Sequence, residues 1–263
     1  MEAAVKVSER ELLLLIVDVN PYAWSNSKLL EKISLEKFLD TILVFINSYL
    51  LLSHGNLLAV VASHNQSCTI LFPEGSNAAD SLLLFKAKAD NFNAKHSLLA
   101  AALGKSLCYI HRFRNNEKFQ ELLSRILLLT VSEDHSVQYL SIMNSIYAAE
   151  KLKIPIDCCV ISENDSGFLQ QASTLTKGLY YKVDLNGSKY LLQYLLTIFL
   201  PSVELRKDLR LPIQKEVDFR ASCFCHNQVI SLGFVCSVCL SVYCGDVPIC
   251  STCQSRFRPW NSE

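Results

Sequence analysis

Long apolar runs alternate with amphipathic segments between residues 8 and 200, and this alternation restricts the fold more than any other feature. The run at 12–19, "LLLLIVDV", has no side suited to solvent, so it predicts a strand buried on both faces. The run at 68–72 follows a short polar turn and predicts an edge or antiparallel strand. Further strands are predicted at 57–63, 125–131, 154–161 and 179–183.

Helical periodicity fills the intervals between these strands. Apolar residues recur at helical spacing in 35–51, 97–113, 134–152, 167–178 and 188–200. Ser34 and Asp134 are suited to the N-cap positions of two of these helices, and Gly178 is suited to closing a third. Strands that alternate with helices predict an α/β fold, with a doubly wound, mainly parallel sheet over residues 8–200.

The charge balance limits the kinds of partner. Lys+Arg and Asp+Glu are both 25, so the formal net charge is +0. Proteins that bind nucleic acid through its phosphates usually have a basic excess, so any DNA contact is expected to be indirect. The N-terminal residues contain no secretory signal, and no apolar run approaches the ~18 residues of a membrane span. We therefore expect an intracellular chain with reduced thiols and no membrane contact.

The cysteines cluster near the end of the chain, where seven of the 11 lie between residues 223 and 253. Cys236 and Cys239 form one C-x-x-C pair, and Cys250 and Cys253 form a second. Two such pairs typically supply four thiolates to one tetrahedral, structural Zn²⁺ ion, although disulfides or free core thiols are the alternatives. We predict a zinc module at 221–258 and, before it, a charged linker or wrapping arm at 201–220.

Four further side chains in the module have the chemistry of metal ligands: Cys223, Cys225, His226 and Cys244. Together they would make a second site, because Cys223 and His226 have the spacing of a zinc knuckle. Cys244 follows Tyr243, and it is equally suited to be a small buried side chain in a hairpin. The sequence leaves open whether the module holds one metal ion or two. A zinc-assisted nucleic-acid binder is a further alternative, although Arg256 and Arg258 are the main cations of the region.

Asp18 ends the first predicted strand, at the edge where ligands gather in a doubly wound sheet. Adhesion-type von Willebrand factor A domains have D-x-S-x-S at this place and bind Mg²⁺ through several oxygens. Here Asn20 and Tyr22 replace the two serines, and the later "LLLTVSED" lacks the expected second Asp next to its Thr. We therefore favour a role for Asp18 in capping backbone N–H groups. A binding domain with Asp18, Asn20 and Ser97 around Mg²⁺ is the alternative.

Catalytic signatures are weak. Only 8 Gly occur, and none forms G-x-G-x-x-G. An aspartyl phosphotransferase would need an acid where Asn20 stands. Cys158 and Cys159 lie within an apolar run, which favours core positions over a nucleophilic role. These features favour a protein without enzymatic activity that acts through its surfaces.

Three long stretches together resemble one family: "LLLLIVDVNPYAW" (12–24), "SRILLLTVSEDHSVQYLSIMNSIYAAEKLKIPIDCCVI" (124–161) and "DFRASCFCHNQVISLGFVCSVCLSVYCGDVPICSTC" (218–253). The chain resembles the subunit 3 family of general transcription factor IIH (TFIIH), the smaller von Willebrand A-like subunits of the TFIIH core. The resemblance covers nearly the whole chain, and the cysteine tail is its most specific part.

The resemblance implies a nuclear, non-enzymatic structural subunit that serves RNA polymerase II transcription initiation and nucleotide excision repair through protein contacts. It implies other TFIIH core subunits as partners, above all the larger zinc-bearing von Willebrand A-like subunit. The zinc ligands that it implies are Cys236, Cys239, Cys250 and Cys253. The segment 73–95 is short, and the chain ends at Glu263 without the expected lysine-rich tail, so contacts made there by relatives are left open.

Overall fold

A single sheet organises the larger part of the computed structural model. The structure describes residues 10–25, 32–73, 96–116, 119, 122–184, 189–214, 217, 219–220, 223–226 and 230–257. Within them, six strands lie in the order β3-β2-β1-β4-β5-β6. Their bounds are β1 Glu11–Asp18, β2 Leu57–Ser63, β3 Cys68–Phe72, β4 Leu123–Thr130, β5 Ile156–Ile161 and β6 Tyr180–Val183. Neighbouring strands are parallel except β2 and β3, which confirms the doubly wound sheet and its antiparallel edge strand.

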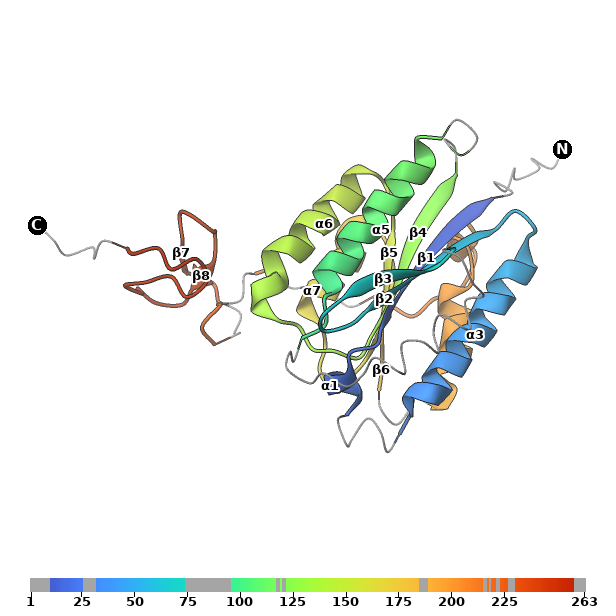
Figure 1. The fold of residues 1–263 in the computed structure, drawn as a ribbon, viewed down its shortest axis with the longest axis horizontal. Coiled ribbons are helices and arrows are strands. Elements are labelled where there is room, and N and C mark those ends of the chain that lie inside the picture. The colour runs from blue at the N-terminus through green and yellow to red at the C-terminus, as the bar shows by residue number, and fades with distance from the viewer. Residues whose placement is uncertain are drawn as a thin grey trace, which may run out of the picture.

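Helices cover both faces of this sheet (Figure 1). One face carries α3 (Leu35–Leu52) and α8 (Leu191–Tyr194), which continues as a π-helix, η4 (Leu195–Phe199). The other carries α5 (Leu99–Arg114), α6 (Tyr139–Lys151) and α7 (Gly167–Thr176). The short elements are α1 (Pro21–Trp24), η2 (Ser136–Gln138), η5 (Leu205–Lys207), β7 (Phe234–Val235) and β8 (Val242–Tyr243).

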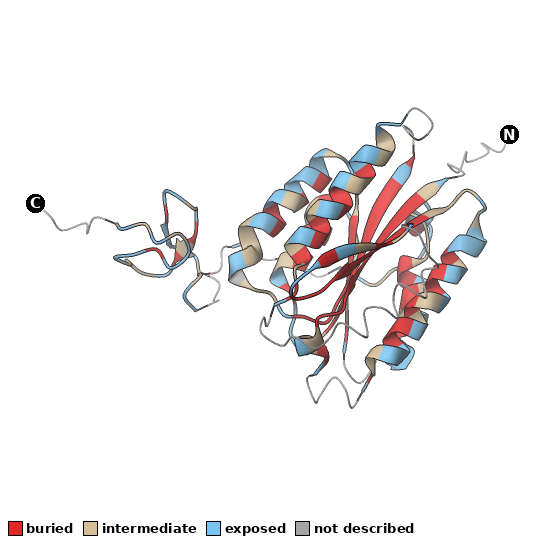
Figure 2. Cartoon of the chain, viewed as in Figure 1, coloured by how far each residue is buried: buried red, intermediate tan, exposed pale blue. Residues whose placement is uncertain are grey.

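The period-2 geometry of a strand explains why β1 is apolar throughout. Leu13, Leu15 and Val17 pack toward α3 and η4, whereas the residues between them pack toward α5 and α6. Figure 2 shows the buried residues concentrated along the strands and on the sheet-facing sides of the helices. Two apolar layers therefore share one sheet, and this arrangement holds the carboxyl end of β1 in a fixed place.

Two of the three predicted helix ends are as expected, and one is wrong. Ser34 caps α3, because its hydroxyl accepts from the backbone N–H of Lys37. Gly178 follows the end of α7, and a Cβ at this position would lie 2.0 Å from the carbonyl oxygen of Ile156, so only glycine fits. Asp134 does not cap the 134–152 helix. That helix begins at Tyr139, after the turn η2.

Asp134 instead serves a neighbouring helix. Its carboxylate accepts from the backbone N–H of Phe168 at 3.1 Å and from the hydroxyl of Ser166, the N-cap of α7, at 2.5 Å. Ser97 likewise does not cap α5, since its hydroxyl pairs with that of Ser63. The segment 73–95 carries a short apolar patch at 82–85, and this patch lies outside the described residues.

A charged network lies at the amino edge of the sheet, opposite Asp18. Arg125 of β4 is fully buried, 2.7 Å from the carboxylate of Glu11 and 3.5 Å from that of Asp157. Arg206, in the segment that follows η4, completes the network with two hydrogen bonds to Asp157 of 2.8 and 2.6 Å. Further along this segment, Gln214 accepts from the backbone N–H of Tyr180 on the edge strand β6.

Loss of the Arg206 side chain is expected to destabilise the α/β domain. In Arg206→Met, the carboxylate of Asp157 loses its bidentate partner while buried, which typically costs about 3 kcal/mol or more. We expect the midpoint of thermal unfolding to fall by roughly 6–12 °C. The exposed Arg210 provides a matched control, Arg210→Met. Equal midpoints for the two variants, measured by circular dichroism, would show that the Arg206–Asp157 pair does not stabilise the domain.

Candidate metal centres

Two turns of matching geometry carry the paired cysteines. In the first, the N–H of Cys236 donates to the carbonyl of Ser241, and the N–H of Leu240 donates to the carbonyl of Cys236. In the second, Cys250, Gln254 and Ser255 repeat the same pattern. Leu240 and Gln254, which directly follow the second cysteine of each pair, both have a φ of 60°. Each C-x-x-C is thus a closed turn that points two sulfurs to the same side.

The two turns bring their four sulfurs together. Cys236, Cys239, Cys250 and Cys253 all have their Sγ atoms within 4.8 Å of one another. The Sγ of Cys236 is 3.6 Å from that of Cys253, and the Sγ of Cys239 is 3.5 Å from that of Cys250. Four sulfurs at ~2.3 Å from a common centre would be about 3.8 Å apart, so the spacing fits a tetrahedral metal site. A disulfide requires about 2.0 Å, and none of the 11 cysteines forms one.

Hydrogen bonds within this cluster stabilise the thiolate form of Cys250. Burial raises the pKa of the Cys250 thiol, but the Tyr243 hydroxyl and the backbone N–H groups of Cys253 and Thr252 outweigh it and lower the pKa to about 5. The pKa of Cys239 is raised, first by burial, to about 11. One thiol therefore ionises readily, and the last protons leave more easily when a cation balances the charge.

Tyr243 and the serines of the turns are the site residues that sequence reasoning missed. The Tyr243 hydroxyl lies 3.0 Å from the Sγ of Cys250. Ser241 and Ser255 each place a hydroxyl 3.1 Å from the Sγ of Cys239 and Cys253, respectively. The available signal was a serine two residues after the second cysteine of each pair, which recurs in both turns.

The module contains a second group of ligand-type side chains. Cys223, Cys225, His226 and Cys244 place their ligand atoms within 4.8 Å of one another. Cys244 is exposed, so the alternative that it is a buried side chain of the hairpin is wrong. The structure therefore brings the four candidate ligands of each set close to one another, and either set could hold a metal ion.

The carboxylate of Asp18 lies at the carboxyl edge of the sheet and is surrounded by hydrogen-bond donors. Its Oδ2 accepts from the hydroxyl of Thr130 at 2.9 Å and from the backbone N–H groups of Val131 and Ser132 at 3.3 and 3.0 Å. Its Oδ1 accepts from the N–H of Asn20 at 3.2 Å. Donor N–H groups occupy the positions that a cation would need, so the geometry supports the capping role of Asp18.

Asn20 and Ser97 do not assemble with Asp18 into an oxygen cage. The Oδ1 of Asn20 accepts from the N–H of Tyr22, and its amide nitrogen donates to the hydroxyl of Ser132. The hydroxyl of Ser97 is 2.8 Å from that of Ser63. Because these oxygens already have partners, the arrangement disfavours the Mg²⁺-dependent alternative.

Cys158 and Cys159 are fully buried in β5, as expected for core residues. Burial raises the pKa of both thiols, and that of Cys159 reaches about 12. Neither sulfur forms a thiolate at neutral pH, which disfavours a nucleophilic role. Every helix in the described parts of the chain is too short or too polar to cross a bilayer.

These features define a class: a von Willebrand factor A-like α/β domain joined to a small cysteine-rich module. The fold is similar to the VWA domain of SpRpn10, with a TM-score of 0.50 and 16% identity over 71% of this chain and 94% of that one. It is also similar to the TFIIH p34 N-terminal domain, with a TM-score of 0.64 and 28% identity over 71% of this chain and 96% of that one.

The chain belongs to the transcription factor Tfb4 family, whose model matches residues 10–82 and 79–254. It is 38% identical to general transcription factor IIH subunit 3 of Dictyostelium discoideum, over 86% of this chain and 68% of the relative. It is also 38% identical to general transcription and DNA repair factor IIH subunit tfb4 of Schizosaccharomyces pombe, over 94% of this chain and 88% of the relative. These similarities confirm the family expected from the sequence.

Proposed function

We propose that this protein is a non-enzymatic structural subunit of the TFIIH core, acting in the nucleus in transcription initiation and nucleotide excision repair. The support is its membership of the Tfb4 family, together with relatives that are named as TFIIH transcription and DNA repair subunits. The buried thiols of β5 and the satisfied carboxylate of Asp18 are in keeping with a role in assembly rather than catalysis.

We further propose that Cys236, Cys239, Cys250 and Cys253 bind one structural Zn²⁺ ion. The observation that carries this proposal is the tetrahedral spacing of their four sulfurs. Thiolates favour zinc over hard cations, and a closed set of four leaves no open position for a substrate. We also propose the division into an α/β domain at 8–200, a linker or wrapping arm at 201–220 and a zinc module at 221–258.

The zinc module has an apolar outer surface that suits a protein partner. This module surface consists of exposed Leu232, Phe234, Val235, Val238, Leu240 and Ile249. The module is small, and six exposed apolar side chains on it are typical of an interface rather than of a free surface. The partner we propose is another TFIIH core subunit, specifically the larger zinc-bearing von Willebrand A-like subunit.

Polar substitution of the module surface is expected to weaken this assembly. Leu232 and Val238 are 87% and 68% exposed, so Leu232→Ser with Val238→Ser removes apolar area while all the proposed metal ligands are kept. Co-purification with the larger subunit is expected to fall roughly tenfold or more, while zinc per chain stays unchanged. Leu51→Ser is the matched control, because Leu51 lies near the end of α3 and is 85% exposed. Equal recovery of both variants in the complex would place the interface elsewhere.

A further inference from the structure

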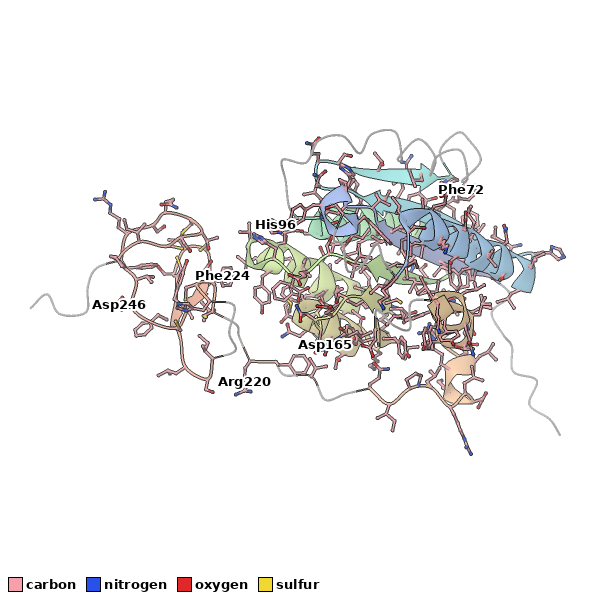
Figure 3. The ribbon with its side chains drawn as sticks, turned by 90° about the horizontal axis from the view of Figure 1, so that it is seen from below. Phe72, His96, Asp165, Arg220, Phe224 and Asp246 are labelled. Carbon is pink, nitrogen blue, oxygen red and sulfur yellow. The ribbon has the colours of Figure 1, made fainter. Side chains whose placement is uncertain are left out.

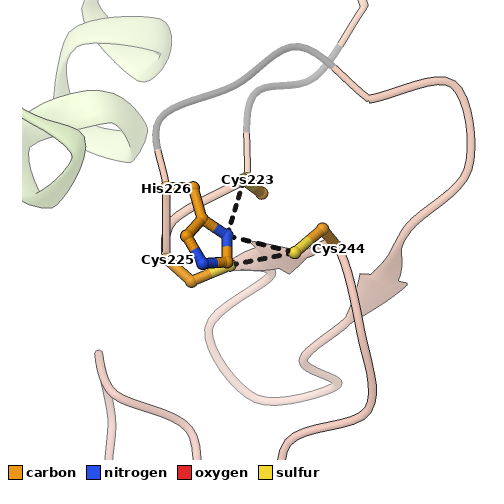
Figure 4. A group of neighbouring side chains, drawn as sticks. All are labelled: Cys223, Cys225, His226 and Cys244. Atoms are coloured by element: carbon orange, nitrogen blue, oxygen red, sulfur yellow. Dashed lines mark hydrogen bonds between the residues drawn. The ribbon is translucent and has the colours of Figure 1, made fainter.

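Four side chains of the module form a second cluster apart from the two C-x-x-C turns. Figure 4 shows the His226 ring between the sulfurs of Cys223 and Cys244, with Cys225 beside it. The Nδ1 of His226 is 3.3 Å from the Sγ of Cys244 and 4.0 Å from that of Cys223. The Sγ of Cys225 is 3.4 Å from that of Cys244. We propose that Cys223, Cys225, His226 and Cys244 bind a second Zn²⁺ ion.

The spacing of the cluster fits a closed Cys₃His site. A nitrogen at ~2.0 Å and a sulfur at ~2.3 Å from one tetrahedral ion would be about 3.5 Å apart. The two nitrogen-to-sulfur distances lie on either side of this value, and all four ligand atoms lie within 4.8 Å of one another. The Sγ atoms of Cys225 and Cys244 are 3.4 Å apart, whereas the two sulfurs of a disulfide are about 2.0 Å apart. Three thiolates and an imidazole are a typical structural zinc set.

Three of the four side chains in this cluster are open to solvent. Cys225, His226 and Cys244 are exposed, and only Cys223 is buried. A backbone hydrogen bond from the N–H of Phe224 to the carbonyl of Val242 places the ligand turn beside the hairpin strand β8. Exposed thiols converge on one point in a reducing compartment most readily when a metal ion holds them.

The second ion would also fix the position of Phe224, because this residue lies in the sequence between two of the proposed ligands, Cys223 and Cys225. The Phe224 ring is 6.5 Å from that of Tyr243 in the module and 6.1 Å, edge-on, from that of Tyr139 in α6. Figure 3 shows Phe224 on the side of the module that faces the α/β domain. The first ion holds the two knuckles together, whereas the second would hold the start of the module against β8 and direct Phe224 toward α6.

Zinc content of the full-length chain tests this proposal. After zinc saturation and removal of the excess, elemental analysis is expected to give about two ions per chain, and about one in Cys225→Ser, Cys244→Ser and His226→Ala. Cys108→Ser and His111→Ala, both on the exposed side of α5, are expected to retain two. One ion per chain in the unaltered protein, or two ions in all three ligand variants, would overturn the proposal.

His226→Cys separates loss of a ligand from loss of folding. This variant is expected to keep two ions, and its Co²⁺ form should absorb at longer wavelength because a fourth thiolate replaces the imidazole. In His226→Ala, amide hydrogen exchange is expected to rise at 223–226 and stay low at 246–257. Loss of both ions together in His226→Ala and His226→Cys would instead assign the histidine to folding of the whole module. The zinc count does not depend on whether the chain assembles with TFIIH subunits, so the two proposals fail separately.

Discussion

Replacement of Cys236 by serine is expected to unfold the zinc module while leaving the α/β domain intact. Cys236 is buried, and with Tyr243 and Cys250 it makes up the small core of the module. So few buried side chains cannot offset the entropy of ordering the turns, whereas zinc binding supplies on the order of 10–16 kcal/mol. The variant should lose at least one zinc ion per chain, and chymotrypsin should cleave within 230–257, after Phe234 or Tyr243.

The thermal midpoint of the α/β domain reports on the rest of the chain in the same variant. We expect it to stay within a few degrees of the unaltered protein, because the sheet has its own two apolar layers. Cys108→Ser, which changes an exposed thiol on α5, is the matched control. A Cys236→Ser protein with full zinc content and unchanged resistance to chymotrypsin would contradict the structural role of the metal.

The sheet could be predicted from the sequence because burial on both faces produces uninterrupted apolar runs. β1, β2 and β5 have no solvent-facing side, and the helices between them carry a single apolar stripe. Arg125 shows the limit of this reasoning. It lies in an apolar strand and is fully buried, and its partners Glu11 and Asp157 belong to other strands. The pairing depends on strand order, which hydrophobicity alone does not give.

Helix starts were harder to predict because caps can come from distant residues. At the start of α5, the backbone N–H of Ala100 donates to the Oε1 of Gln138 at 3.2 Å. Asp134 caps α7 rather than the helix that follows it in sequence. A local rule of spacing cannot identify such partners, because they are brought close by the packing of α5, α6 and α7.

The two candidate metal sites differ in how far the sequence determined them. The C-x-x-C pairs keep their two sulfurs on one turn, so their spacing already implied a shared site. The second cluster joins the turn 223–226 to Cys244, which directly follows β8. The backbone hydrogen bond from the N–H of Phe224 to the carbonyl of Val242 holds this turn beside β8, and the sequence gives no sign of it. Its sequence pattern was compatible with a site and equally compatible with a buried thiol.

Asp18→Asn is expected to destabilise the α/β domain strongly, and Mg²⁺ is expected to have no effect on either form. The substitution keeps the size of the side chain but removes the negative charge and one of the two acceptor oxygens. An amide N–H₂ group must therefore face either the N–H of Asn20 or the N–H groups of Val131 and Ser132, which the carboxylate satisfied together. Each buried donor left without an acceptor costs roughly 1–3 kcal/mol, so we expect a loss of about 3–4 kcal/mol. The midpoint of thermal unfolding should then fall by roughly 8–12 °C.

The response to Mg²⁺ separates a capping carboxylate from a metal ligand. If Asp18 bound the ion, millimolar Mg²⁺ would raise the midpoint of the unaltered protein and not that of Asp18→Asn, since a ligand stabilises the form that binds it. We expect identical midpoints with Mg²⁺ and with chelator in both proteins. Asp40→Asn, on the exposed side of α3, is the control for removal of one negative charge. A Mg²⁺-dependent rise that disappears in Asp18→Asn but persists in Asp40→Asn would restore the adhesion-type site.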